Sequence, residues 1–266
     1  MTKIVVTGAG GFIGWHVVTR LRSEGHEVAA YTHETADICK PFELPEGYDV
    51  VIHCAGNARM FWSVGHLIED FTVNALGTLH ALNATLKAKI EKFIFLSTSA
   101  IDEPVPYTPY VLSKLAAESY VKYYRDTYKL DTLIIRPTKV FGPGMKKNVI
   151  YDLIEAHIAR KPLKLEYKPS SVFDFLYIDD LVEGLCWFAT HTVEQCYSTW
   201  PLVYSSFRGS VEAINDLINL ITGYECELVV MPGALEYTVA EDWPSNTGFS
   251  EIEQRLRTTI AWMEHR

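Results

Sequence analysis

A tyrosine and a lysine placed four residues apart are the side chains in this sequence best suited to acid–base chemistry. Tyr110 and Lys114 lie in a stretch with helical periodicity that continues through Glu118. Residues four apart on a helix project from the same face, and a lysine cation lowers the pKa of a nearby phenol from about 10 toward the working range. The pair predicts proton exchange with an alcohol or a ketone, with a surface tyrosine and a solvated lysine as the structural alternative.

A glycine-rich turn near the N-terminus offers a second kind of chemistry. Residues 3–7 form a short apolar run that passes directly into Gly8, Gly11 and Gly14. Glycine permits a tight turn and a close approach of the backbone, and a helix that follows presents free N–H groups to an anion. Because the glycines stand between a strand and a helix, they predict a pyrophosphate site for a dinucleotide, although glycine clusters also form ordinary turns.

The elements that must position these residues alternate regularly. In the first half of the chain we expect strands at 3–7, 27–31, 49–53, 92–97 and 131–136, and helices at 13–24, 67–89 and 108–128. Such alternation implies right-handed crossovers and a parallel sheet that is covered on both faces. The sequence therefore predicts the α/β class, with a doubly wound parallel Rossmann sheet.

The rhythm becomes irregular beyond residue 144, which predicts a small, trimmed C-terminal substrate lobe. The expected helices are 147–160, 179–190, 209–222 and 250–264, and the expected strands are 163–167, 173–177 and 226–231. We assign residues 1–145 and a return segment, 172–202, to the dinucleotide-binding domain. Residues 146–171 and 203–266 then form the substrate-binding lobe.

Composition limits the classes of partner. The 266 residues, 48% of them hydrophobic, suffice for one large α/β unit with a smaller lobe. A formal net charge of -9 without clusters of Lys and Arg argues against nucleic acid. A strand that begins at residue 3 leaves no room for a signal peptide, and no apolar run approaches the roughly 18 residues of a membrane span. We therefore expect a cytoplasmic protein without membrane contact.

The cysteines are odd in number, scattered and without a CxxC pair, which argues against a disulfide framework or a metal site. We expect reduced thiols at all five positions, which are Cys39, Cys54, Cys186, Cys196 and Cys226.

Seven short motifs follow one another along the chain. They are Gly8-x-x-Gly11-x-x-Gly14, Asp49-Val50-Val51-Ile52-His53-Cys54-Ala55-Gly56, Asn74-Ala75-Leu76-Gly77-Thr78, Ser97-Thr98-Ser99-Ala100, Tyr110-x-x-Ser113-Lys114, Arg136-Pro137-Thr138-Lys139-Val140-Phe141-Gly142-Pro143-Gly144 and Asp174-Phe175-Leu176-Tyr177-Ile178-Asp179-Asp180. In this order they resemble the extended short-chain dehydrogenase/reductases, which include the NAD-dependent epimerase/dehydratases of nucleotide sugars. Residues 248–262 also resemble the last helix of that family.

The resemblance implies a role for each matching residue. Tyr110 would be the acid/base, Lys114 would orient the nicotinamide ribose and lower the pKa of Tyr110, and Thr98 would hydrogen-bond the reacting substrate oxygen. The implied substrate contacts are Thr98, Ser99 and Asn148. The implied cofactor contacts are Gly8, Gly11, Phe12, Ile13, Gly14, Thr32, His33, Asp37, Ala55 and Lys114, with Asp37 meeting the adenine amino group.

Two departures from the family pattern bear on ligands. Thr32, followed by His33, stands where NAD users carry an acid for the ribose hydroxyls. The cofactor is therefore NAD or NADP, with a slight preference for NADP. Phe173 stands where nucleotide-sugar enzymes carry an arginine for the diphosphate, and a phenylalanine cannot neutralise a phosphate. Lys164, Lys168 or Arg208 would have to substitute, or remain solvated surface charges.

The resemblance implies an NAD(P)-dependent epimerase or ketoreductase that transfers a hydride at a carbinol or carbonyl carbon, with a nucleotide sugar as the leading substrate. A 4,6-dehydratase is disfavoured because Ser99-Ala100 replaces its Asp-Glu pair. The alternatives are a reductase of a nonsugar carbonyl compound and a noncatalytic dinucleotide sensor, which has no need for Tyr110 and Lys114.

The family's pattern also implies a homodimer. Two long helices, 67–89 and 108–128, would form its four-helix interface, and Leu115, Tyr120 and Tyr124 are suited to that face or to packing on the chain's own sheet.

Overall fold

The computed structural model describes residues 1–103, 107–191, 202–237 and 249–265, so Cys196 and Gly248 lie outside the described residues. The chain divides into two compact units. Unit 1 comprises Met1–Pro137 and Leu181–Val203, and unit 2 comprises Thr138–Asp180 and Tyr204–Arg266. Residues 138–145, which the sequence analysis assigned to the dinucleotide-binding domain, thus belong to unit 2.

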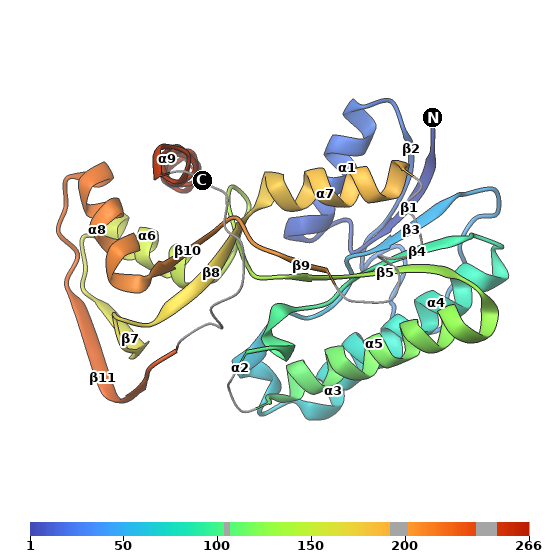
Figure 1. Cartoon of the computed structure of the whole chain (residues 1–266), viewed down its shortest axis with the longest axis horizontal. Helices are drawn as coiled ribbons and strands as arrows, with labels where there is room; N and C mark the ends of the chain where they lie inside the picture. The colour runs from blue at the N-terminus through green and yellow to red at the C-terminus, as the bar shows by residue number, and fades with distance from the viewer. Residues whose placement is uncertain (104–106, 192–201, 238–248, 266) are drawn as a thin grey trace. The chain divides into compact units, whose positions relative to one another are not determined.

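A twisted sheet of mostly parallel strands forms the centre of unit 1 (Figure 1). Its strands are β1 (Lys3–Thr7), β2 (Glu27–Tyr31), β3 (Val50–His53), β4 (Lys92–Leu96), β5 (Asp131–Pro137) and β9 (Leu202–Tyr204). They lie in the order β2-β1-β3-β4-β5-β9, and β1 to β5 pair in parallel. All four residues of β3 are buried, as expected for a strand covered on both faces. The predicted doubly wound sheet is confirmed.

Helices cover both faces of this sheet. Figure 1 shows α1 and α7 over one face and α4 and α5 over the other. The helices of this part of the chain are α1 (Phe12–Ser23), α2 (Met60–Ser63), α3 (Leu67–Phe71), α4 (Gly77–Lys87), α5 (Pro109–Tyr128), α7 (Ile178–Thr190) and a short 3₁₀ turn, η2 (Ser99–Ile101). The core between sheet and helices includes Leu82, Phe93, Phe95 and Val121, all of which have no exposed surface.

The predicted helix 67–89 is interrupted. Between α3 and α4 the chain forms a π-helical turn, η1 (Thr72–Leu76), so that the helical run is a composite of three pieces. A π turn holds one more residue than an α turn, and such turns occur frequently at functional sites. Here it accompanies the burial of two polar side chains one turn apart, Asp70 and Asn74.

The described residues of unit 2 form two small sheets and three helices. Its elements are β6 (Lys139–Phe141), α6 (Val149–Ala159), β7 (Leu163–Tyr167), β8 (Val172–Tyr177), β10 (Phe207–Ser210), α8 (Val211–Thr222), β11 (Leu228–Leu235) and α9 (Phe249–Glu264). One sheet has the order β10-β8-β6 and the other pairs β11 with β7. The predicted helix start at residue 209 is wrong, because residues 207–210 pair with β8 and Ser210 then caps α8.

No helix in the described part of the chain is long and apolar enough to cross a membrane. The described cysteines, Cys39, Cys54, Cys186 and Cys226, are all free. Within the same residues, no group of three or more His, Cys, Asp or Glu side chains is arranged to hold a metal ion.

Candidate active site

The glycine turn brings backbone into contact with backbone. Gly8 has a φ of +71°, and a Cβ there would lie 2.6 Å from the Ala55 nitrogen at the end of β3. A Cβ at Gly14 would lie 2.2 Å from the Gly8 oxygen, so neither position accepts a side chain without movement of the backbone. Gly8 therefore allows the β1–α1 turn to approach the residues after β3, and Gly14 allows the start of α1 to approach Gly8.

Gly11 has a different function in the same turn. It is the N-cap of α1, and it has no side chain that could accept hydrogen bonds from the free N–H groups of the first helical turn. Its own N–H donates to the Gly8 oxygen at 2.9 Å. Phe12 and Ile13 follow as the first helical residues. An uncapped helix N-terminus beside a glycine cradle fits a pyrophosphate, because its N–H groups and its dipole favour an anion.

The segment after β2 lies beside this turn. The Ala9 N–H donates to the Tyr31 oxygen at 2.9 Å, and a Cβ at Gly10 would lie 3.5 Å from the Thr32 side chain. The Thr32 N–H donates to the Thr35 hydroxyl at 2.8 Å, which fixes a local turn, and the neighbouring His33 is exposed. The structure thus places Thr32 directly after β2 and beside the glycine turn.

Asp37 is constrained within its own loop. One carboxylate oxygen accepts the Cys39 N–H at 3.0 Å, and this hydrogen bond lowers the pKa of Asp37. The carboxylate is therefore ionised at neutral pH and oriented by the backbone.

Tyr110 and Thr98 are brought together from different elements. Tyr110 lies in the first turn of α5 and is 7% exposed, and its hydroxyl interacts with Thr98, which follows β4. Burial raises the pKa of Tyr110 to about 12, although the interaction with Thr98 opposes the shift. The expected lowering of this pKa by Lys114 is wrong for this structure, because desolvation of the phenolate outweighs the other influences.

Lys114 is directed toward the strand ends rather than toward the phenol. Its ammonium group donates to the Leu96 oxygen at 2.8 Å and lies 4.9 Å from the centre of the Phe95 ring. Burial lowers the pKa of Lys114 to about 8. A Cβ at Gly56 would lie 3.2 Å from this Nζ, so the glycine after β3 leaves room for the cation.

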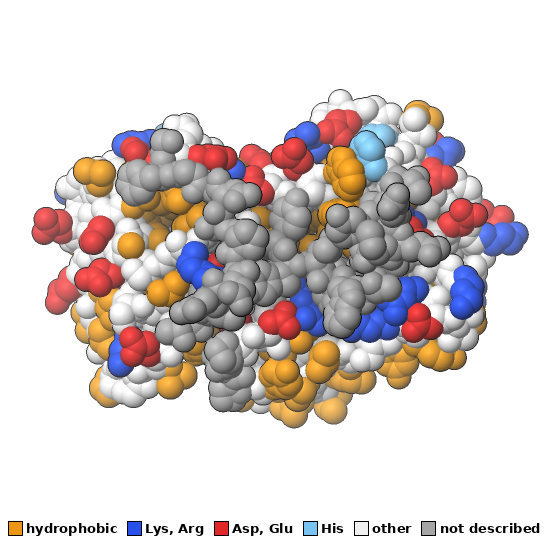
Figure 2. Space-filling model, viewed as in Figure 1, with side chains coloured by type: hydrophobic (Ala, Val, Ile, Leu, Met, Phe, Trp, Pro, Cys, Tyr) orange, Lys and Arg blue, Asp and Glu red, His pale blue; other side chains and the backbone are white. Residues whose placement is uncertain are grey.

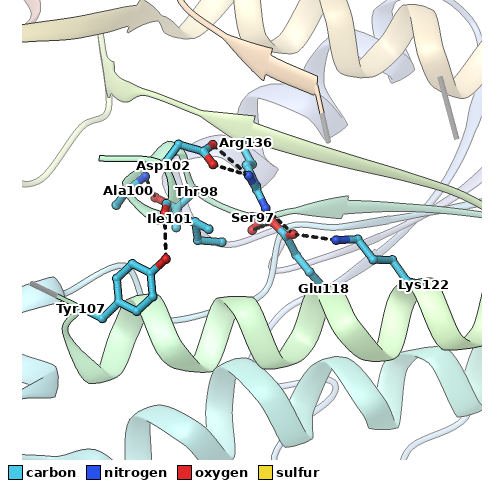
Figure 3. A network of polar contacts seen from close by, with 9 residues as sticks. All are labelled: Ser97, Thr98, Ala100, Ile101, Asp102, Tyr107, Glu118, Lys122 and Arg136. Carbon is cyan, nitrogen blue, oxygen red and sulfur yellow. Dashed lines mark hydrogen bonds and ion pairs between the residues drawn. The ribbon is translucent and has the colours of Figure 1, made fainter. Parts of the chain in front are cut away.

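A network of charged residues holds the segment that carries Thr98 (Figure 3). Before Thr98, the Ser97 hydroxyl donates to Glu118 on α5 at 2.6 Å. After it, Asp102 accepts two bonds from Arg136 at 2.7 and 2.8 Å. Arg136 also donates to both oxygens of Glu118, at 2.7 and 2.6 Å. The short 3₁₀ turn is thereby anchored at both ends, to α5 and to β5.

A second polar network lies beneath Tyr110 and was not predicted. Asp70 on α3 has no exposed surface, and it accepts the Ser113 hydroxyl at 2.6 Å and the Asn74 amide at 3.1 Å. Asn74 also donates to the Asn57 oxygen at 3.1 Å and accepts its N–H at 2.8 Å. The motif that contains Asn74 was the sequence signal for this network. The contact between Asp70 and Ser113 could not be predicted, because the two residues are 43 positions apart in the sequence.

The implied substrate residues fall in two separate regions. Ser99 is buried in the 3₁₀ turn of unit 1, next to Thr98. Asn148 lies in unit 2, where its oxygen caps α6 through the Tyr151 N–H at 2.8 Å and its amide donates to the Val140 oxygen at 2.6 Å. Its side chain therefore already organises the start of α6.

Two of the three charges considered as substitutes for the missing arginine have local partners. Arg208 pairs with Asp174 at 2.9 Å, and Lys168 pairs with Glu236 at 2.7 Å. A cation not singled out from the sequence, Lys139, lies 4.2 Å from the centre of the Phe173 ring.

Comparison with known proteins identifies the family. The chain belongs to the NAD dependent epimerase/dehydratase family, whose model matches residues 4–199. It is an enzyme of the extended short-chain dehydrogenase/reductase type. A UDP-glucose 4-epimerase of Mycolicibacterium smegmatis is 28% identical over 223 residues, which cover 68% of this chain and 71% of that protein.

Two further proteins are similar over more of the chain. A GDP-6-deoxy-D-mannose reductase of Pseudomonas aeruginosa is 28% identical over 269 residues, covering 88% of this chain and 84% of the reductase. The structure of UDP-glucose 4-epimerase from Thermus thermophilus in complex with NAD superposes with a TM-score of 0.77, at 24% identity and with 99% of each chain covered. This structural similarity confirms the fold.

Proposed function

We propose that this protein interconverts a nucleotide sugar by oxidising or reducing a carbinol carbon with a bound nicotinamide cofactor. The observation that carries the proposal is the juxtaposition of Thr98 and Tyr110, with Lys114 on the next turn of the same helix. The UDP-glucose 4-epimerase relative supports the substrate class.

The chain's own residues have distinct tasks in this reaction. Tyr110 exchanges a proton with the substrate hydroxyl, and Thr98 holds the oxygen of that hydroxyl by a hydrogen bond. The charge of Lys114 favours the phenolate once a ligand lies between the two side chains. NAD, when bound along the glycine turn, supplies the acceptor for the hydride. Gly8, Gly11 and the start of α1 would hold its pyrophosphate.

Epimerisation is the first candidate, and ketone reduction is the second. The reductase relative favours the second because it covers 88% of this chain, whereas the epimerase relative covers 68%. Both reactions use the same three side chains and differ in whether the hydride returns to the same sugar. A reductase consumes reduced cofactor, and an epimerase does not.

The proposed cofactor is NAD or NADP, with weak discrimination between the two. Thr32 offers one hydroxyl, which cannot accept two bonds from a ribose as a carboxylate would, and His33 beside it cannot clamp a phosphate as an arginine would. Asp37 would meet the adenine. The slight preference for NADP stays a prediction.

Unit 2 is the proposed substrate lobe. The proposed substrate contacts are Ser99 of unit 1 and Asn148 of unit 2. Lys139 is a further cation in unit 2, partly buried beside an aromatic ring. The cytoplasmic location expected from the sequence stays a prediction.

The decisive test is incubation of the purified protein with a panel of UDP, GDP and dTDP sugars, with and without NADPH. Product formation without loss of NADPH indicates an epimerase, and product formation coupled to its oxidation indicates a reductase. A lack of turnover under both conditions, together with tight binding of the dinucleotide, would favour the sensor.

A homodimer through α3 and α5 is part of the same proposal. Figure 2 shows hydrophobic side chains gathered along the lower edge, where Figure 1 places α2, α3 and α5. Large apolar side chains of these helices are exposed, with Phe61 at 70%, Ile68 at 77%, Phe71 at 52% and Tyr120 at 42%. Apolar surface of this kind on a soluble fold marks an interface. Tyr124, expected there, is instead buried and donates to Asn83 at 2.7 Å.

Light scattering tests this assembly. We expect twice the mass of the chain at micromolar concentration, and we expect Ile68→Lys to give a folded monomer. The matched control is Leu220→Lys, which alters an exposed leucine on α8 of unit 2. A monomeric unmodified protein would contradict the proposal.

A further inference from the structure

A fully buried carboxylate lies behind the acid–base pair without a cation in contact with it. Asp70 has no exposed surface, and among the described residues it forms no ion pair. Its two oxygens are held by neutral donors, the Ser113 hydroxyl and the Asn74 amide. An isolated buried carboxylate is costly, and a cation at longer range reduces that cost.

Lys114 is the buried cation in the same region. It is 6% exposed, and among the described residues no carboxylate lies within ion-pair distance of its ammonium group. Asn74 lies near both ions. A Cβ added at Gly56 would lie 2.9 Å from the side-chain oxygen of Asn74 and 3.2 Å from the Lys114 Nζ. The amide that binds Asp70 is thus close to Lys114.

The other titratable groups that face Lys114 supply no unbalanced charge. His53 on β3 is neutral, since burial lowers its pKa to about 3, and Cys54 is a neutral thiol, since burial raises its pKa to about 12. Glu118 on α5 is a carboxylate, but Arg136 binds both of its oxygens and Lys122 lies 3.6 Å from one of them. Asp70 remains as the uncompensated negative charge.

We propose that Asp70 is a positioning residue for the reaction, which holds the positive charge on Lys114 and fixes Ser113 and Asn74 beneath Tyr110. The carboxylate touches neither substrate nor cofactor in this arrangement and acts through its neighbours. The inference rests on the proposed function, because it assigns a catalytic use to the charge of Lys114.

The direction of the electrostatic effect follows from the sign of the charge. A negative charge near an ammonium group favours the protonated form, so Asp70 opposes the lowering of the Lys114 pKa by burial. It also disfavours the phenolate of Tyr110, as does Glu103. Removal of this one charge therefore lowers the pKa of both groups, and Lys114 loses its proton at a lower pH.

The test follows Lys114 itself by NMR, in full-length protein containing carbon-13-labelled lysine. The signal of Lys114 is assigned by its loss in Lys114→Met, and its titration is compared in Asp70→Asn and in the unmodified protein. We expect a midpoint near pH 8 in the unmodified protein and a midpoint lower by about one pH unit in the variant. Asp70→Ser, which lacks the charge but has a different shape, should shift in the same direction.

Two control variants separate charge from packing. Glu69→Gln removes the adjacent, exposed carboxylate on α3 and should leave the midpoint unchanged. Ser113→Ala removes a hydrogen bond of Asp70 but keeps its charge, so the midpoint should not fall. An unchanged midpoint in both Asp70 variants, or an equal fall in Ser113→Ala, overturns the proposal. The titration needs no turnover, so its result is independent of the nucleotide-sugar panel.

Discussion

The two units surround their buried charges differently. In unit 1, Glu118 pairs directly with Arg136, but Asp70 and Lys114 are almost fully buried and are held in place by neutral hydrogen-bonding groups. In unit 2, Asp174 contacts Arg208 directly and Asp180 contacts Arg255 directly. Burial without a contacting carboxylate lowers the pKa of Lys114 to about 8. Because groups with shifted pKa values gather at functional sites, this supports our proposal that the acid–base chemistry belongs to unit 1.

Unit 2 also contains a cluster of packed aromatic residues around Phe173. Unit 2 packs Phe173 against Tyr167, Phe175 and Tyr237, with ring centres 5.5 to 6.3 Å apart. Such a cluster packs the interior of a lobe, which is consistent with our proposal that unit 2 is the substrate lobe. Mutations in the two units should therefore change different quantities.

The largest effect is expected for Tyr110→Phe. The change removes the phenolic proton and keeps the ring, so kcat should fall by about 100- to 10,000-fold while the cofactor binds as before. Steady-state kinetics together with calorimetric titration of NAD would measure both quantities. If more than about a tenth of the activity remained, Tyr110 would not be the acid/base.

We expect Phe173→Arg, which introduces the arginine that the family carries at this position, to destabilise unit 2. The side chain is 5% exposed, and the ammonium group of Lys139 lies 4.2 Å from the ring centre. A second buried cation there should destabilise the protein by about 3–5 kcal/mol in chemical denaturation. Phe173→Leu, the control, should cost less than about 2 kcal/mol. Improved binding of a nucleotide sugar by a stable Phe173→Arg variant would contradict this view.

Gly11→Val should weaken dinucleotide binding by at least about tenfold, or 1.4 kcal/mol. A branched side chain at the N-cap of α1 would fill the space that the pyrophosphate needs, and a Cβ there already approaches the Gly8 oxygen to 3.2 Å. Gly65→Val, at a position with open space around its Cβ, is the matched control and should leave the affinity unchanged. Equal affinities in the two variants would make the turn purely structural.

The smallest effect is expected at the ribose. Thr32→Asp places a carboxylate at the end of β2, which should repel a 2′-phosphate and shift the preference between NAD and NADP toward NAD by about tenfold. The unmodified protein should discriminate by no more than about 10- to 100-fold. Titration of both cofactors measures this ratio, and a strong intrinsic preference for NAD would mean that a residue other than Thr32 reads the ribose.

Local patterns were sufficient to predict much of unit 1. The glycine spacing, the apolar strand runs and the pair Tyr110 and Lys114 depend on residues close in sequence, and the structure places them in the predicted elements. The π turn between α3 and α4 and the short strand β10 escaped prediction because a helical or turn pattern does not reveal how the chain pairs in space.

The degree of burial of each side chain was a second property that the sequence did not reveal. The direction of the Tyr110 pKa was mispredicted, because spacing on a helix reveals proximity to Lys114 but not the desolvation that determines the result. Asp70 was missed for a related reason. An acid in the segment Glu69-Asp70 looks like one of two surface charges, and only the tertiary contacts bury one of them and leave the other exposed.

The central claim is that Tyr110 allows hydride transfer from the carbinol carbon of a nucleotide sugar. Its most direct test is a single-turnover measurement of reduced nicotinamide absorbance after the NAD-loaded protein is mixed with the sugar that the panel identifies. We predict a rise in absorbance in the unmodified protein and none in Tyr110→Phe with the same amount of NAD bound. An equal rise in both proteins, or no rise in the unmodified protein with any nucleotide sugar, would contradict the account.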